Sequence, residues 1–193
     1  NFFEAYDLFM KEKMKRKLWK KSTTKRYKNI KNLLKDFEKI TKYKLSFSNI
    51  NNEFYSEFND YCYNHKNHFT NTFSRNIGLF KTFMFWSIKM KFTYNETFKE
   101  FVKPVRVLTR QEALTLDDIK HLYDFSFKND KMEEARDMFV LQCLVGLRYG
   151  DLKFINKRTV NSRDCIVLKE EKGSAKPTRE IPLMSISKAI IYD

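Results

Sequence analysis

Apolar residues recur at helical spacing through the first half of the chain. The clearest stripe lies within residues 22–41 and consists of Tyr27, Ile30, Leu33, Leu34, Phe37 and Ile40. Similar stripes cover residues 2–18, 53–63 and 71–90, and Ser22–Thr24 supplies N-cap candidates for the second helix. Because the 193 residues include only 4 Gly and 3 Pro, few positions interrupt these stripes. The pattern predicts a mainly α fold that begins with a four-helix bundle over residues 1–98.

Positive charge is concentrated in one segment. The formal net charge is +14, and residues 11–44 hold 15 Lys and Arg against 3 Asp and Glu, whereas residues 104–193 hold 16 against 14. A basic segment whose apolar residues form a core indicates a polyanionic partner, and nucleic acid is favoured over a membrane surface. The alternative is a solvated basic face, which the shortage of acidic residues for i,i+4 pairing disfavours. No apolar run approaches the roughly 20 residues of a membrane span.

The three cysteines indicate neither disulfides nor a metal site. Cys62, Cys143 and Cys165 are odd in number and scattered, which is typical of reduced cysteines in a cytoplasmic protein. Cys62, His65 and His68 stand three residues apart, but without a fourth ligand at a known spacing they are a weak metal signal. We therefore expect neither a metal nor a cofactor.

The helical stripe is lost ahead of a second domain. Residues 99–113 contain Pro104 and two arginines, Arg106 and Arg110, and we expect them to form a basic linker that can follow a phosphate backbone. Thr115–Asp118 has the pattern of a capping box in front of an amphipathic helix. This helix begins a second domain of mixed α+β structure over residues 114–193.

The second domain is predicted to contain a further helix and a hairpin. The helix covers Glu133–Leu147, and the hairpin pairs a strand at Cys165–Leu168 with one at Thr178–Leu183 across a polar turn. The pattern predicts that another helix starts within Ser187–Asp193, so we expect this domain to be incomplete.

The stretch Met138–Leu152 places two charged residues at the end of an apolar helix. Gly146 breaks the helix, and Arg148 and Asp151 follow just beyond what should be the deepest part of a core. Arginine keeps its charge at any working pH, so it must be solvated or paired. These residues alone leave two interpretations open, a surface ion pair and an arginine that binds an anion.

In this order, these features resemble the tyrosine recombinase, or phage integrase, family, and most of all the integrases of conjugative transposons and related bacterial mobile elements. The matching features are the basic bundle, the basic linker, Gly-Leu-Arg-x-x-Asp-Leu at 146–152, and a hairpin with a turn lysine and Ile-Pro-Leu at 181–183. The resemblance implies that a core-binding (SAM-like) domain and a catalytic domain form a clamp around duplex DNA. It also implies that a tyrosine attacks a DNA phosphodiester to give a 3′-phosphotyrosyl intermediate, without metal or nucleotide.

The resemblance assigns roles to residues of the second domain. Arg148 corresponds to the first catalytic arginine, whose planar guanidinium grips the scissile phosphate and stabilises the transition state. Asp151 corresponds to the acidic position that orients this arginine. Lys172 best matches the turn lysine that protonates the leaving 5′-oxygen, with Lys176 as the alternative and Lys169 third. An ordinary polar hairpin turn remains the other interpretation of these lysines.

The family's His-x-x-Arg motif and nucleophilic tyrosine lie downstream of the hairpin, and the chain stops at Asp193. None of the 10 tyrosines present stands at the nucleophile's position, and Tyr149 is expected to pack in the core. We therefore expect a truncated integrase of the bacterial cytoplasm that is inactive and monomeric by itself, whereas the parent protein assembles as a homotetramer on DNA.

The cations expected to contact DNA lie on the first two helices, on the fourth helix and in the linker: Lys11, Lys15, Lys20, Lys21, Lys25, Arg26, Lys28, Arg75, Lys81, Arg106 and Arg110. Two other functions stay open. The chain could belong to a non-enzymatic regulatory protein that binds DNA, or to a helical protein that binds RNA. A downstream His-x-x-Arg motif and a late tyrosine would identify the recombinase.

Overall fold

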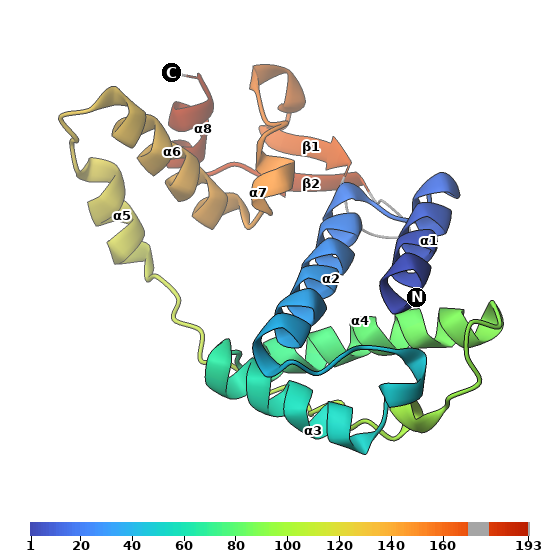
Figure 1. Cartoon of the computed structure of the whole chain (residues 1–193). Coiled ribbons are helices and arrows are strands. Elements are labelled where there is room, and N and C mark those ends of the chain that lie inside the picture. Colours follow the sequence, from blue (N-terminus) through green and yellow to red (C-terminus); the bar gives the residue numbers. More distant parts are fainter. Residues whose placement is uncertain (170–177, 193) are drawn as a thin grey trace. The chain divides into compact units, whose positions relative to one another are not determined.

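The chain forms a mainly helical structure with one antiparallel hairpin, as the sequence predicts (Figure 1). The structure, a computed structural model, describes residues 1–169 and 178–192. It divides into two compact units, Asn1–Thr109 and Arg110–Asp193, which are described separately below. Within the described residues, no helix combines the length and the apolar character needed to cross a membrane.

The first unit is a bundle of four α-helices with short connections. Its helices are α1 (Phe2–Lys15), α2 (Lys21–Thr41), α3 (Asn52–Asp60) and α4 (Thr70–Lys89). Two 3-10 turns, η1 (Phe47–Asn49) and η3 (Thr97–Lys99), and a π-helical turn, η2 (Tyr61–His65), which extends α3, complete the unit.

Aromatic rings fill the interior of this bundle. Tyr6 of α1 lies 4.5 Å from Phe83 of α4, measured between ring centroids, and Phe37 of α2 lies 5.4 Å from Phe58 of α3. These four side chains are at most 1% exposed. Burying one such side chain contributes about 1.5–3 kcal/mol, so the aromatic stripes that predicted the helices also hold them together.

The start of α2 differs from the prediction. Lys20, and not a residue of Ser22–Thr24, is the N-cap, and its side chain forms no capping hydrogen bond. The Thr24 hydroxyl donates to the Lys20 carbonyl at 3.4 Å, inside the first turn. Trp19 stacks on Tyr27 with ring centroids 4.2 Å apart, so ring packing and not a side-chain cap fixes where the chain enters α2.

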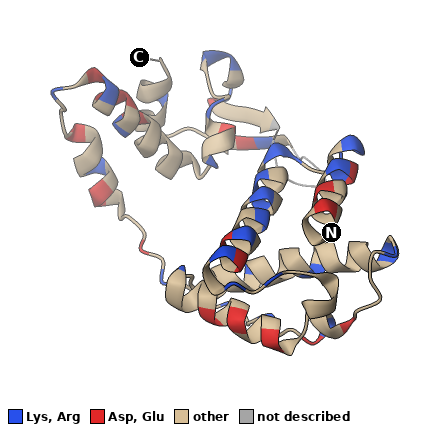
Figure 2. Ribbon diagram, in the orientation of Figure 1, with Lys and Arg blue, Asp and Glu red and all other residues tan. Residues whose placement is uncertain are grey.

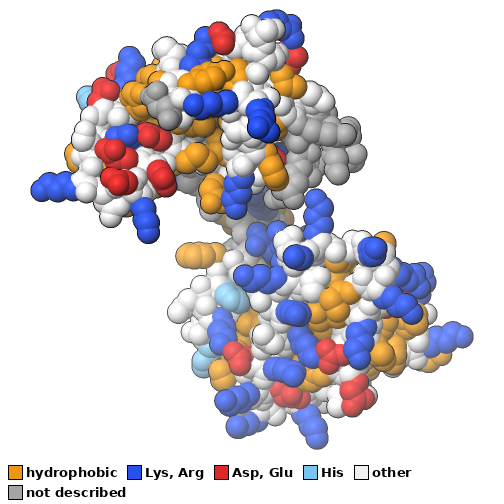
Figure 3. Space-filling model, turned by 90° about the horizontal axis from the view of Figure 1, so that it is seen from above, with side chains coloured by type: hydrophobic (Ala, Val, Ile, Leu, Met, Phe, Trp, Pro, Cys, Tyr) orange, Lys and Arg blue, Asp and Glu red, His pale blue; other side chains and the backbone are white. Residues whose placement is uncertain are grey.

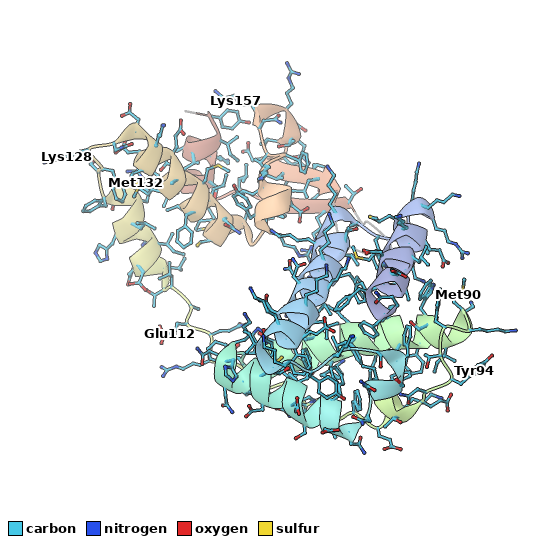
Figure 4. All side chains as sticks on the ribbon, in the orientation of Figure 1. Met90, Tyr94, Glu112, Lys128, Met132 and Lys157 are labelled. Carbon is cyan, nitrogen blue, oxygen red and sulfur yellow. The ribbon has the colours of Figure 1, made fainter. Side chains whose placement is uncertain are left out.

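Residues with positive φ follow helices of the first unit, among them Lys42, the C-cap of α2, with a φ of 63°. Lys17 has a φ of 52°, and α1 therefore ends at Lys15 and not near Leu18 as the apolar pattern suggested. Lys91 has a φ of 61° just after α4. Met90 and Tyr94 near this second turn are 48% and 80% exposed (Figure 4). The apolar pattern alone does not show where a helix ends, because exposed apolar residues continue it.

The second unit combines helices with the predicted hairpin. Its elements are α5 (Leu116–Asp124), α6 (Asp130–Val145), α7 (Tyr149–Leu152), the 3-10 turn η4 (Lys157–Thr159), β1 (Cys165–Lys169), β2 (Thr178–Pro182) and α8 (Ser185–Tyr192). The capping box is confirmed, since the Thr115 hydroxyl accepts from the backbone N–H of Asp118 while the Asp118 carboxylate accepts from that of Thr115. The strands pair antiparallel with Ile166 opposite Ile181.

The prediction that Met138–Leu147 is a buried helix is only partly right. Val140, Leu141 and Val145 are buried, and Leu141 and Val145 join Leu152 of α7 and the hairpin strands in the core of this unit. Phe139, by contrast, is 45% exposed. An apolar helix can therefore have one exposed face, because burial depends on which neighbouring elements cover it and not on its own composition.

Candidate nucleic-acid interface and phosphate-binding pair

One face of α2 carries a continuous row of lysines. The row, called here the lysine stripe, consists of exposed residues separated by three, four or seven positions: Lys21, Lys25, Lys28, Lys35 and Lys39. At 100° per residue these positions fall on one side of the helix, opposite the buried Tyr27, Ile30 and Leu34. The stripe extends for roughly 27 Å at 1.5 Å per residue. Figure 2 marks the basic residues along the α2 ribbon in blue.

The few acidic residues of this segment are engaged elsewhere. Glu12 pairs with Arg16 at 3.1 Å and accepts a hydrogen bond from Trp86. Asp36 pairs with Lys66 at 3.0 Å, and Glu38 accepts from the backbone N–H of Leu45. The positive charge of the stripe is therefore not neutralised by the acids closest to it in sequence, which favours an external anion as its partner.

The other predicted cations of α1 and α2 are exposed as well. Lys11 and Lys15 stand one helical turn apart on α1, and Lys20 precedes α2. Arg26 lies on α2 about 100° around the helix axis from Lys25 and lines a hollow with Arg75 of α4. Among the described residues, none of these four forms an ion pair with a carboxylate. Basic side chains dominate the surface that the first unit presents in Figure 3. The structure thus brings these predicted cations onto the surface of one unit.

Lys81 has a hydrogen-bond partner within the first unit. Its ammonium group donates to the backbone carbonyl of Lys99 at 2.9 Å, which ties α4 to the 3-10 turn η3. Burial lowers the pKa of Lys81. A half-buried ammonium that donates to a backbone carbonyl supports the fold, and the DNA contact expected of Lys81 stays a prediction.

Arg75 and Arg106 lie beside the same hollow of the first unit, which has a volume of about 600 Å³. Arg75 projects from α4, whereas Arg106 belongs to the segment that follows η3. Lys103 lines this hollow too and was missed by the sequence analysis. Arg110 begins the second unit, and its exposed guanidinium lies 3.9 Å from the Glu112 carboxylate.

The pair Arg148 and Asp151 is positioned by the turn between α6 and α7. Gly146 ends α6 with a φ of 63°, a left-handed conformation that glycine adopts without strain. Leu147 and Leu152 are buried on either side of the pair. The Gln142 amide donates to the Leu147 carbonyl at 3.1 Å, which fixes the turn from the side of α6.

The geometry of this pair suits a phosphate. The Arg148 guanidinium lies 3.8 Å from an Asp151 carboxylate oxygen, and the two side chains are 58% and 4% exposed. A buried carboxylate this close to a largely exposed guanidinium can orient the arginine towards an anion. The predicted turn lysines, Lys172 and Lys176, lie outside the described residues, and Lys169 pairs with Thr178 at the end of β1.

Tyr149 is not the packing residue that the sequence suggested. Its ring is 62% exposed, and the Lys153 ammonium lies 4.6 Å from the ring centroid. This ring lies in α7, next to Arg148 in sequence. The reason is geometrical, because the short helix α7 buries Asp151 and Leu152 and thereby directs Tyr149 outward.

The residues of the weak metal signal do not form a site. Cys62 lies in the core of the bundle, and burial raises the pKa of its thiol to about 12, so the thiolate that binds metals is disfavoured. His65 stacks on Tyr61 with ring centroids 6.0 Å apart, whereas His68 contacts Asn76 on α4. Across residues 1–169 and 178–192, no three His, Cys, Asp or Glu side chains are grouped as a metal would require.

Known proteins share this fold. Residues 1–104 match the family model described as the phage integrase SAM-like domain. Two solved structures of the Tn1549 transposon integrase, both in complex with circular intermediate DNA, align with TM-scores of 0.69 and 0.64 at 13% sequence identity. Each alignment covers 96% of this chain, but only 63% and 62% of the integrase chain. No curated protein sequence matches. With its SAM-like bundle and an integrase fold along nearly all of its length, the chain belongs to the phage integrase family of tyrosine recombinases.

Proposed function

We propose that this chain binds duplex DNA as part of a site-specific tyrosine recombinase that integrates or excises a mobile element. The observation that carries the proposal is the lysine stripe on α2, because it lies on a domain of the phage integrase SAM-like family. Further support comes from the Tn1549 transposon integrase, whose structures with the same fold contain DNA. The first unit, residues 1–109, then contains the core-binding domain of residues 1–98, and residues 99–113 connect this domain to the catalytic domain.

In this proposal Arg148 holds the scissile phosphate. Its guanidinium can donate two parallel hydrogen bonds to non-bridging phosphate oxygens, and the transition state of phosphoryl transfer carries more charge on these oxygens than the ground state. Asp151 orients the guanidinium from its buried position. Lys172, or Lys176 in its place, protonates the leaving 5′-oxygen, and the attacking group is a tyrosine hydroxyl that becomes linked to the 3′-phosphate.

The DNA-binding part of the proposal is tested by the salt dependence of affinity. Each phosphate contact releases counterions from the DNA and adds about 0.9 to the steepness with which log K falls against log salt. A protein held by six or more contacts therefore loses at least ~10³-fold in affinity between roughly 50 and 200 mM salt. We expect a fluorescein-labelled duplex to show such a loss in fluorescence anisotropy. An affinity that does not change with salt would contradict the proposal. Competition with duplex RNA separates DNA binding from RNA binding.

The catalytic part is tested in the complete gene product with Arg148→Ala. We expect cleavage of a DNA substrate to fall by at least ~10²-fold while duplex binding persists, because the guanidinium acts mainly on the transition state. Arg158→Ala is a matched control, since this exposed arginine of η4 forms no ion pair within the described residues. Normal cleavage by Arg148→Ala would refute the assignment. A substrate with an activated 5′ leaving group should rescue only the alanine variant of whichever lysine, Lys172 or Lys176, is the acid.

A further inference from the structure

The segment after η3 is not a loose connection but is fixed to the first unit by its backbone. The Tyr55 hydroxyl of α3 donates to the Val102 carbonyl at 2.9 Å, and the Ser74 hydroxyl of α4 donates to the Pro104 carbonyl at 2.8 Å. Asn71 of α4 makes two hydrogen bonds to one residue: its amide nitrogen donates to the Val107 carbonyl at 2.8 Å, and its amide oxygen accepts from the Val107 N–H at 2.9 Å.

These contacts form an ordered series along α4. Asn71, Ser74 and Gly78 occupy successive turns of the helix on one side, and they meet Val107, Pro104 and Lys103 in the reverse order. The stem of Lys103 crosses Gly78, where an added Cβ would lie 3.7 Å from the lysine Cε. Segment 102–107 therefore runs antiparallel to α4, and helical spacing sets the register of its contacts.

The docked segment gathers three cations around one hollow. Arg75 of α4 and Lys103 and Arg106 of the segment line the space of about 600 Å³, together with the hydroxyl and amide side chains of Ser74 and Asn71. No carboxylate is among the residues that line it in the described part of the chain. Two guanidinium groups and an ammonium around a polar hollow have the composition that binds phosphate oxygens.

We propose that Arg75, Lys103 and Arg106 bind one backbone phosphate of duplex DNA, and that Asn71 and Ser74 are positioning residues that hold segment 102–107 for this purpose. The proposal rests on the proposed DNA-binding function and names a contact that α2 does not supply. Fixing the segment before DNA arrives reduces the entropy lost on binding, so uncharged residues influence an electrostatic contact.

A double-mutant cycle between Asn71 and Arg106 tests the proposal by anisotropy on a labelled duplex. Because the three cations share one phosphate, Arg106→Ala should reduce the steepness of the salt dependence by at most about 0.9 and the affinity at 0.1 M salt by at most about eightfold, extrapolated from 1 M salt. Asn71→Ala should weaken binding although no charge is lost. In the Asn71→Ala background, Arg106→Ala should reduce DNA affinity by a much smaller factor than in the wild-type background, because the guanidinium is no longer held in place. If Arg106→Ala reduces the affinity by the same factor in both backgrounds, the positioning role of Asn71 is refuted.

Hydrogen exchange tests the two hydrogen bonds between Asn71 and Val107 in the absence of DNA. The Val107 amide should exchange faster in Asn71→Ala, whereas the Phe101 amide, which donates to the Phe98 carbonyl at 3.3 Å, should not change. An unchanged exchange rate of the Val107 amide would show that Asn71 does not hold the segment in place. Ser74→Ala provides a second variant of the same kind if Asn71→Ala does not fold, and its Arg106 cycle should give the same sign of coupling.

The outcomes separate this proposal from the proposed function. If the wild-type chain binds duplex DNA without salt dependence, the DNA-binding function fails and the phosphate site fails with it. A second outcome is that binding depends on salt and weakens when lysine-stripe cations are removed, whereas neither Arg75→Ala nor Arg106→Ala changes the slope. In that case the DNA-binding function stands and only the phosphate site in the hollow is refuted.

Discussion

Replacing two lysines in the middle of the lysine stripe is the sharpest test of the nucleic-acid interface. Lys25 and Lys28 lie three residues apart on the exposed face of α2, and neither forms an ion pair within the described residues. Alanine is a better helix former than lysine, so the double substitution should not weaken α2. Any loss of DNA affinity then reflects the missing charges and not a damaged helix.

The expected magnitude follows from counterion release. Each lysine that contacts a phosphate contributes about 0.9 to the slope of log K against log salt, so Lys25→Ala/Lys28→Ala should lower the slope by ~1.8. Extrapolated from 1 M salt, this corresponds to a loss of affinity of ~60-fold at 0.1 M and ~18-fold at 0.2 M. The loss of affinity should become smaller as the salt concentration rises. This dependence is diagnostic, because a packing defect would not vary with salt in this way.

The assay is fluorescence anisotropy on a labelled duplex over a series of salt concentrations. The matched control is Lys44→Ala/Lys89→Ala, which removes the same charge from two exposed lysines of the first unit outside the stripe. The control should leave the slope nearly unchanged. If both double variants lower the slope equally, net charge and not the face of α2 determines binding, and the reasoning is refuted. An unchanged slope in the stripe variant would exclude Lys25 and Lys28 as phosphate contacts.

Three further predictions concern particular residues. Gly146→Ala should destabilise the protein by about 1–2 kcal/mol in denaturant unfolding, because an alanine at a φ of 63° is strained although its Cβ would meet no neighbouring atom; an unchanged midpoint would contradict this. A thiol reagent should modify the exposed Cys143 in the native protein, but Cys62 only after unfolding, because burial raises the Cys62 pKa to about 12. Burial, and then the nearby Lys66, lower the pKa of His68 below 6.5, so the unfolded chain binds the proton more readily. Stability should therefore be full above pH 6.5 and fall as the pH drops below it, and His68→Gln should flatten this fall.

The helices could be predicted because their burial and their amphipathic pattern have the same cause. Tyr27, Ile30, Leu34 and Phe37 form a stripe in the sequence and are all at most 5% exposed in the bundle. The start of α2 could not be placed from Ser22–Thr24, since the stacking of Trp19 on Tyr27 decides it. A contact between two residues eight positions apart cannot be recognised from the helical periodicity of apolar residues.

The candidate site was predictable where it depends on local spacing. Lys21, Lys25 and Lys28 fall on one face of α2 because helical geometry requires it once the helix is known. The hydrogen bond of Lys81 to Lys99 was not predictable, because its partner is a backbone carbonyl, and backbone acceptors are present at every position of any sequence. Asn71 and Val107 are 36 residues apart and were missed for the same reason.

Arg148 and Asp151 show how far a motif constrains geometry. Their spacing of three residues places both on one turn, but it does not determine which of them is buried. The structure buries Asp151, at 4% exposed, and leaves Arg148 58% exposed. A surface ion pair would expose both side chains and contribute little to stability. Burying the carboxylate costs desolvation energy, which a purely structural pair at the surface would avoid. The arrangement is reasonable if the carboxylate's purpose is to hold a guanidinium towards an incoming anion, and Leu147 and Leu152 supply the packing that keeps it there.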